Sequence, residues 1–312
     1  MHRLSLNFSQ QPKGGFYLKN SVRSLGRVEN IKGWLLSGPY WIFAAIFFAY
    51  PFVWLVMLAL SKWNFISPRK TVWLDNLVKI FQDPMFWTIT WNTTRFMLYF
   101  IPMVLSLSII LAMAFSKAKH FQAFFAMSFL LANVSSGVAY SIIFTQLFSV
   151  NGPANNFLYN HFGVFIPWFS SPSWAMFSIA IMVTWKFMGY YALIFLAGLQ
   201  AIPKELYEAA EIDGATKWTQ FWKITLPLLN SSIVMVMVLA ITLAFGIFTE
   251  PYMITGGGPL NSTQTFLMVI YTDAFLKYQP GYAAMLSIIA AGMSFGLIIL
   301  TRKLIERKVE FS

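Results

Sequence analysis

The chain has 312 residues, of which 58% are hydrophobic and 11% are charged, with a net charge of +11. Its mean hydropathy is +0.62. A soluble domain is typically about 25% charged, so this composition excludes an ordinary soluble protein and predicts a membrane protein. The absence of cysteine excludes disulfides and thiol chemistry. Basic residues gather near the ends and in short loops, which favours orientation in a bilayer over nucleic-acid binding.

Residues 1–33 form a basic arm, and the apolar stretch after them exceeds the roughly 7–15 residues of a secretory signal core, so we expect a retained first span. A membrane span needs about 20 predominantly apolar residues. Six segments meet this condition, which predicts an all-α polytopic membrane protein with six transmembrane helices. The predicted spans are Trp34–Leu60, Trp91–Phe115, Phe121–Phe148, Ser173–Gln200, Ser232–Thr249 and Ala283–Thr301.

Lysine and arginine residues divide unevenly between the two sides of a six-span chain. Fifteen fall on one side and six on the other, and Lys186 lies within a span. Cytoplasmic segments carry the excess of such residues, so we expect the richer side to be cytoplasmic, together with both termini. The predicted organisation is a cytoplasmic arm over 1–33, a membrane domain over 34–305 and a cytoplasmic tail over 306–312.

A charged segment, EAAEIDGATKWTQFWKITLP, lies between two of the most apolar stretches, from Glu208 to Pro227. Pro203 ends the helix before it, the following residues have helical spacing, and Gly214 predicts a turn. A second amphipathic piece follows, whose apolar side comprises Trp218, Phe221, Trp222 and Ile224. Such a helix–turn–helix lies in the headgroup layer or docks on a soluble partner. Four acidic residues within nine positions, Glu205, Glu208, Glu211 and Asp213, favour docking.

The spacing of this segment is specific. Glu208-Ala209-Ala210, then Gly214, then nine residues and Ile224-x-Leu226-Pro227 form the pattern EAA-x3-G-x9-I-x-L-P. It resembles the signature of the permease subunits of type I ABC importers. Further stretches are similar to the carbohydrate branch of that family, typified by maltose and glycerol-3-phosphate permeases. They are WKFMGYYALIFLAGLQAIPKELYEAAEIDGA (185–215), TGGGPLNST (255–263), the IYTDAF run and Trp91-Asn92-Thr93.

The resemblance implies a type I ABC importer permease fold in a bacterial inner membrane, with a cytoplasmic coupling loop over 201–230. It implies four kinds of partner: a second homologous permease, two cytoplasmic ATPase subunits, an extracytoplasmic solute-binding protein and a carbohydrate substrate, with lipid around the spans and no nucleic acid. The residues implied to contact the ATPase or transmit its motion are Glu208, Ala209, Ala210, Asp213, Gly214, Ile224, Leu226 and Pro227. Around the third span the family often has a Leu-Pro stretch, where this chain reads Leu130-Leu131-Ala132-Asn133.

No nucleotide-binding loop is present, because the glycine cluster Gly256–Gly258 is followed by Pro259 and not by Lys-Ser/Thr. The three histidines are scattered and no HExxH motif occurs. We therefore expect no enzyme activity, no metal and no cofactor in this chain, and expect ATP and magnesium to bind the partner ATPase.

Polar groups within membrane spans are costly and are candidates for function, although packing between helices also uses them. Lys186 is the sharpest case, since it could snorkel, pair with Glu250 or face a substrate carboxylate. The substrate is therefore either a neutral oligosaccharide or an acidic, uronate or alginate-like one. The candidate pathway residues are Asn133, Ser136, Tyr140, Trp185, Lys186, Tyr190 and Glu250, with the third-span residues and Gln146 expected near one helix face.

An ion-coupled secondary transporter is the alternative function. It would need several acidic residues within the membrane to carry coupling ions, whereas the predicted spans offer Glu250 alone, at the end of one of them. We therefore expect the transmembrane permease of an ATP-driven sugar importer.

Overall fold

A computed structural model describes residues 32–117 and 122–305. Most of the predicted basic arm and the whole of the predicted tail lie outside these residues. The chain divides into two compact units after Met57. The first unit holds most of the apolar helix Lys32–Ala59, which contains a π-helical turn, η1 (Ala45–Ala49), followed by α2 (Tyr50–Ala59). This helix is long and apolar enough to cross a membrane.

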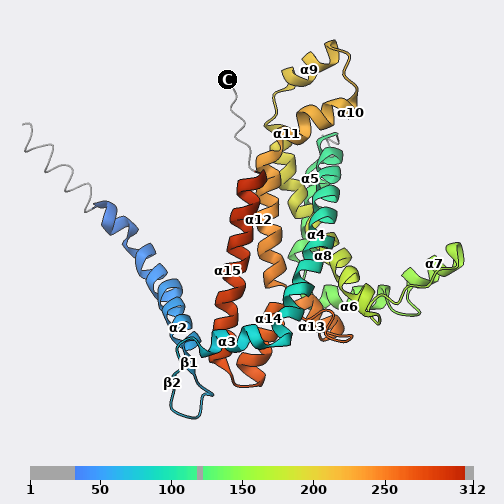
Figure 1. The fold of residues 1–312 in the computed structure, drawn as a ribbon. Helices are drawn as coiled ribbons and strands as arrows, with labels where there is room; N and C mark the ends of the chain where they lie inside the picture. Colours follow the sequence, from blue (N-terminus) through green and yellow to red (C-terminus); the bar gives the residue numbers. More distant parts are fainter. Residues whose placement is uncertain (1–31, 118–121, 306–312) are drawn as a thin grey trace, which may run out of the picture. The chain divides into compact units, whose positions relative to one another are not determined.

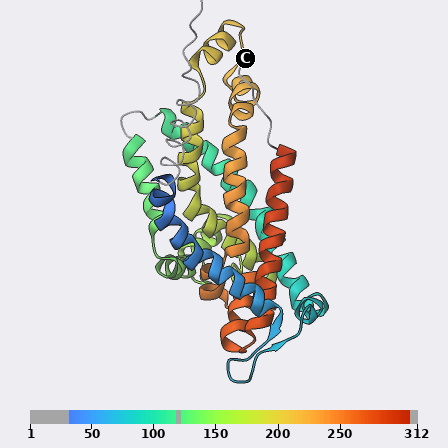
Figure 2. The same ribbon diagram turned by 90° about the vertical axis from the view of Figure 1, so that its left-hand side faces the viewer.

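The second unit is built on four long helices that run side by side (Figures 1 and 2). They are α4 (Pro84–Lys117), α8 (Pro172–Gln200), α12 (Asn230–Gly246) and α15 (Pro280–Ile305). The α4 helix packs along α8, and α12 contacts α4, α8 and α15. Buried aromatic rings fill the contact, including Phe96, Phe100 and Phe195. Ser108 on α4 also donates a hydrogen bond of 2.9 Å to the carbonyl oxygen of Met188 on α8.

Shorter elements lie at the two ends of this bundle (Figure 1). One end carries α9 (Lys204–Ile212), α10 (Lys217–Gln220), η2 (Phe221–Thr225) and α11 (Leu226–Leu228). We call it the α9 end. The opposite end carries β1 (Ser61–Lys62), β2 (Lys70–Thr71), α3 (Asp75–Gln82), α6 (Gly137–Leu147), α7 (Pro153–Phe162), α13 (Thr249–Thr255), α14 (Phe266–Tyr271) and η3 (Thr272–Leu276). The two strands pair antiparallel in a hairpin that sequence analysis did not predict.

The number of spans agrees with the prediction. Four helices of the described chain are long and apolar enough to cross a membrane, and six segments qualify if each of two bent helix pairs forms one span. The fourth predicted span, Ser173–Gln200, matches α8 to within one residue. The second and sixth begin earlier than predicted, at Pro84 and Pro280, since helix boundaries are the feature that a hydropathy pattern determines least well.

The third predicted span is not one continuous helix. It divides into α5 (Gln122–Val134) and α6, and the axes of Met127–Val134 and Gly137–Leu147 differ by 99°. Ser136 has an extended backbone (ψ 127°), and serine side chains offer the backbone local bonds that compete with a helix. The prediction that Asn133, Ser136, Tyr140 and Gln146 share one helix face is therefore wrong.

The fifth predicted span also ends earlier than expected. The α12 helix stops at Gly246, and Ile247 is extended (ψ 127°). Glu250 consequently lies in the separate helix α13 and not at the end of the span. The stretch between the third and fourth predicted spans contains α7, which begins with Pro153. Proline suits the first helical position because its missing N–H is not needed there.

Candidate functional site

The segment from Lys204 to Pro227 forms the predicted helix, turn and helix at the α9 end. Helix α9 stops in a Schellman motif: the N–H of Ala215 donates to the carbonyl of Ala210 (2.8 Å), and the N–H of Gly214 donates to that of Glu211 (3.0 Å). Gly214 has φ +76°, a conformation in which any residue with a Cβ is strained. The glycine thus sets the angle between α9 and α10.

The second half of the segment is anchored to the bundle. Ile224 and Leu226 are half-buried and pack against its core. Pro227 is the second residue of α11, and α12 begins two residues after α11 ends. The hydroxyls of Tyr207 on α9 and Thr225 on η2 are 2.9 Å apart. Sequence analysis missed this contact, although a buried threonine within an amphipathic stretch is the kind of signal that indicates a side-chain partner. This contact joins α9 to η2, which leads through α11 to α12.

The α9 helix itself buries none of its residues. Glu208, Ala209 and Asp213 are exposed, and the apolar side chains of Leu206 and Ile212 are 40% and 87% exposed. An exposed helix that mixes acidic and large apolar side chains is typical of a surface that another molecule covers.

An ion pair spans the turn after α9. Lys217 on α10 contacts the carboxylate of Glu211 on α9. The hydrogen bond and the charge of Lys217, together with a hydrogen bond from Gln220, hold the pKa of Glu211 below its ordinary value of 4.5. Thr216 caps α10 by accepting a hydrogen bond from the N–H of Thr219 (3.2 Å).

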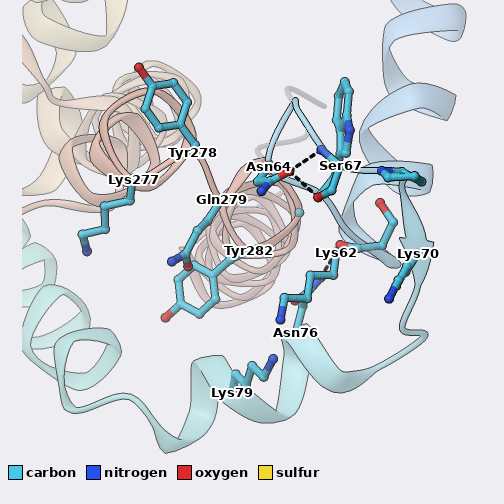
Figure 3. Close-up of a pocket in the computed structure, with 14 residues that line it drawn as sticks. Lys62, Asn64, Ser67, Lys70, Asn76, Lys79, Lys277, Tyr278, Gln279 and Tyr282 are labelled. Carbon is cyan, nitrogen blue, oxygen red and sulfur yellow. Dashed lines mark hydrogen bonds between the residues drawn. The ribbon is translucent and has the colours of Figure 1, made fainter.

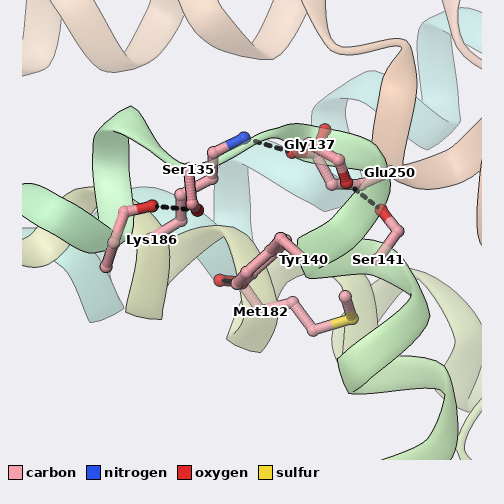
Figure 4. A network of polar contacts seen from close by, with 8 residues as sticks. Ser135, Gly137, Tyr140, Ser141, Met182, Lys186 and Glu250 are labelled. Atoms are coloured by element: carbon pink, nitrogen blue, oxygen red, sulfur yellow. Dashed lines mark hydrogen bonds and ion pairs between the residues drawn. The ribbon is translucent and has the colours of Figure 1, made fainter.

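A second polar cluster lies at the break between α5 and α6, with residues from α6, α8 and α13 (Figure 4). Lys186 on α8 pairs with Glu250 on α13 at 3.0 Å, and their side chains are 12% and 8% exposed. The ammonium lies 5.4 Å from the ring centre of Tyr140 on α6, a cation–π distance. The Tyr140 hydroxyl donates to the carbonyl oxygen of Met182 on α8.

The backbone at the break lies close to the same ion pair. A Cβ at Gly137, the first residue of α6, would lie 3.6 Å from the Lys186 ammonium and 3.0 Å from Thr249 Cγ2. Of the three alternatives for Lys186, the structure shows the pair with Glu250. The cluster joins α6, α8 and α13 at the place where the third predicted span bends.

The structure does not bring all candidate pathway residues into this cluster. Asn133 lies half-buried on α5 before the break, and Ser136 is exposed at the N-cap of α6. Trp185 and Tyr190 on α8 are 51% and 37% exposed. Gln146 is exposed near the end of α6. The residues that meet are Tyr140, Lys186 and Glu250.

Asn92 belongs to the stretch Trp91-Asn92-Thr93, whose similarity to the carbohydrate permeases gave no indication of what Asn92 contacts. Asn92, on α4, is 2% exposed, and its side-chain amide donates to the carbonyl oxygens of Asn261 (2.7 Å) and Gln264 (3.0 Å). It therefore clamps the loop between α13 and α14 onto α4. The sequence feature that could have indicated this contact is a lone asparagine in an apolar helix, because a buried amide needs hydrogen-bond partners.

Comparisons with known proteins agree with this architecture. The lactose transport system permease protein LacF of Rhizobium radiobacter is 34% identical over 285 residues, covering 90% of this chain and 93% of that protein. The sulfoquinovosyl glycerol transport system permease protein SmoG of Agrobacterium fabrum is 34% identical over 277 residues, covering 88% and 90%. The arabinooligosaccharides transport system permease protein AraP of Bacillus subtilis is 30% identical over 287 residues, covering 89% and 88%.

A solved structure shares the fold. A chain of a bacterial ABC transporter involved in the import of the acidic polysaccharide alginate superposes with a TM-score of 0.74 at 22% identity, covering 93% of this chain and 100% of that chain. A family model described as binding-protein-dependent transport system inner membrane component matches residues 28–310. The bundle, its bent spans and the helix–turn–helix at one end are those of a transport permease, and the chain belongs to the binding-protein-dependent transport system inner membrane components.

Proposed function

We propose that the chain is the permease subunit of an ATP-driven carbohydrate importer and that α9 docks in a cleft of a separate ATPase subunit. The observation that carries the proposal is the surface of α9. Its acidic residues and the apolar Ile212 are exposed, while Ile224 and Leu226 anchor the following turns in the bundle core. An element with one free face and one anchored side is suited to transmit a push from a partner.

The proposed mechanism follows from these attachments. Closure of the ATPase subunits on ATP would move α9, and the Tyr207–Thr225 contact and α11 would pass the movement to α12. The two ends of the bundle would then open alternately. Glu208 and Asp213 would supply the polar contacts to the ATPase, which would bind ATP and magnesium.

The same proposal assigns the sides of the membrane. The α9 end would face the cytoplasm with both termini, in a bacterial inner membrane, and the opposite end would receive a solute-binding protein. The domain bounds would be 1–33 for the arm, 34–305 for the permease and 306–312 for the tail. A second, homologous permease would complete the pathway.

The carbohydrate class is supported by the relatives, whose names specify lactose, sulfoquinovosyl glycerol and arabinooligosaccharides. Within this class, the Lys186–Glu250 pair favours a neutral oligosaccharide. A lysine that is already neutralised offers little attraction to a substrate carboxylate, because the pair has no net charge. Trp185 and Tyr190, which are exposed on α8, would supply stacking and hydrogen bonds to sugar faces.

The ion-coupled alternative receives no support from the described helices. The segments α4, α5, α6, α8, α12 and α15 contain no Asp or Glu. Glu250 lies beyond the end of α12 and is already paired with Lys186. A carboxylate that is held in an ion pair is a poor carrier for a second cation.

The proposal is tested by purifying the full chain with the subunits that accompany it and assaying ATPase activity with and without solute-binding protein and sugar. Glu208→Lys should lose the ATPase or uncouple it from sugar. Asp75→Lys makes the same charge change at an exposed residue of α3 at the opposite end and should leave the ATPase bound. If no ATPase accompanies the wild-type chain, or Glu208→Lys stays coupled, the docking role of α9 is wrong.

A further inference from the structure

A cavity of about 610 Å³ lies at the end of the bundle opposite α9, and its lining is strongly basic. Lys62, Lys70, Lys79 and Lys277 line it (Figure 3) together with asparagine, glutamine and tyrosine side chains, and no acidic residue is among the lining residues. We call this cavity the lysine pocket.

The concentration of lysines is unexpected at this end of the bundle. Six lysines and arginines fall on the predicted side opposite the termini, and four of them line the lysine pocket. The six are Lys62, Arg69, Lys70, Lys79, Arg95 and Lys277. Membrane orientation disfavours positive charge on that side, so a specific role has to account for the cluster.

The hairpin places two lysines against each other. Lys62 on β1 is paired in register with Lys70 on β2. Directly opposed residues of an antiparallel pair point to the same face, where like charges destabilise the pairing. Lys79 on α3 brings a third ammonium to the same pocket. Lys186, Lys217 and Lys277 form ion pairs. Lys62, Lys70 and Lys79, by contrast, have no carboxylate partner among the described residues. An anion in the pocket would relieve their repulsion.

The pocket is built on a fixed frame. The side-chain amide of Asn76, which is 5% exposed on α3, donates to the carbonyl oxygens of Ala59 (2.8 Å) and Ser61 (2.9 Å). A Cβ at Gly281 on α15 would collide with the Ser61 carbonyl, so glycine allows the hairpin to lie directly on α15. The Tyr282 hydroxyl donates to Asp83 at 2.8 Å. The walls are therefore held without the lysines.

The position of the pocket indicates the source of the anion. The hairpin begins two residues after α2 ends at Ala59, and α15 begins at Pro280, between the lining residues Gln279 and Gly281. The pocket therefore lies beside the ends of two helices that are long and apolar enough to cross a membrane. Helix α3 buries Asn76 and Ile80 and exposes Val78 and Phe81, as an interfacial helix does. Trp63, Tyr278 and Tyr282 line the pocket, and Trp and Tyr are enriched at headgroup level.

We propose that the lysine pocket binds a phosphate group, supplied by the headgroup of an anionic phospholipid in the adjacent leaflet. Lysines near an anionic surface attract such lipids, and the cavity is within the size range of small-ligand sites. The bound headgroup would hold the hairpin, α3 and the first turn of α15 together. This inference depends on the membrane bundle alone and not on the proposed sugar or ATPase.

The test is native mass spectrometry of the full chain, purified with its accompanying subunits, during titration with phosphatidylglycerol, phosphatidylcholine or inorganic phosphate. Lys62→Gln/Lys70→Gln/Lys79→Gln should weaken one phosphatidylglycerol site by about tenfold or more and leave phosphatidylcholine binding unchanged. The corresponding triple lysine-to-arginine variant should keep the site. Lys117→Gln/Lys204→Gln/Lys303→Gln removes the same charge elsewhere and should also keep it.

Inorganic phosphate separates the two sources of the ligand. Failure of millimolar phosphate to displace phosphatidylglycerol supports a lipid site, and displacement in the wild type supports a pocket that takes the phosphate group from either source. Equal phosphatidylglycerol binding by the wild type and the glutamine variant overturns the proposal. So does a variant that binds lipid normally but loses stimulation by the solute-binding protein, since the lysines would then contact that protein.

Discussion

Lys186 on α8 and Glu250 on α13 form an ion pair of 3.0 Å across 64 positions of sequence. Both side chains are largely buried, and Tyr140 on α6 lies beside the ammonium. The pair thus joins three elements at the bend of the third span. A buried pair of this kind is costly to break from one side, because the remaining charge is left without a partner.

Removal of one partner is expected to destabilise the protein more than removal of both. Glu250→Gln should lower the free energy of unfolding by about 3 kcal/mol, and Lys186→Met/Glu250→Gln should recover most of that loss. Thermal unfolding of the purified chain in detergent measures both. A double variant no more stable than Glu250→Gln would contradict a direct interaction between the two side chains.

Transport by the same variants tests the neutral-substrate proposal. The double variant should retain uptake of a neutral oligosaccharide, since it removes no net charge. If the substrate is an acidic oligosaccharide held by Lys186, both Lys186→Met and the double variant should abolish its uptake. Uptake by reconstituted vesicles, with a neutral and an acidic oligosaccharide in parallel, distinguishes these outcomes.

Asn92 is expected to hold the loop between α13 and α14. Asn92→Ala leaves the carbonyls of Asn261 and Gln264 without their donor and should cost about 2 kcal/mol. Hydrogen exchange should accelerate in residues 256–264, read by mass spectrometry. Asn156→Ala is a matched control, because Asn156 on α7 is exposed and donates to the carbonyl oxygen of the nearby Asn151. Similar exchange in both variants would refute the clamp.

The turn at Gly214 is expected to depend on its left-handed backbone. Gly214→Val should strain the turn by about 1–2 kcal/mol, misplace α9 relative to α10 and lower sugar-stimulated ATPase activity without unfolding the bundle. Gly296→Ala on α15 is the control, since no atom lies within 4 Å of a Cβ there. Unaltered coupling in Gly214→Val would show that the turn geometry does not matter.

The Glu211–Lys217 pair makes the turn sensitive to acid. The pKa of Glu211 is lowered in the folded chain, so its stabilising contribution is fully present above about pH 4.5 and is lost as pH falls through the lowered value. Lys217→Met should raise the pKa of Glu211 toward its ordinary value, measured by carboxyl NMR of labelled glutamate. Lys204→Met, which alters a lysine outside the ion pairs of the described residues, should not shift it.

The sequence by itself determined the features that depend on local composition and spacing. Low charge and long apolar runs indicate a membrane bundle, and the fourth span was predicted almost to the residue because polar and helix-breaking residues bound it. The helix, turn and helix around Gly214 followed from amphipathic spacing and one glycine, and both are local properties of the chain.

Only the tertiary structure decided what depends on contacts between distant residues. Hydropathy continues through the third span on both sides of Ser135 and Ser136, so an average over the segment conceals its bend of 99°. The partner of Lys186 and the clamp formed by Asn92 need helices that lie far apart in sequence. The lysine pocket likewise collects side chains from a hairpin, α3 and the start of α15. These lysines lie around one cavity only because the packing of the bundle brings the hairpin, α3 and the start of α15 together.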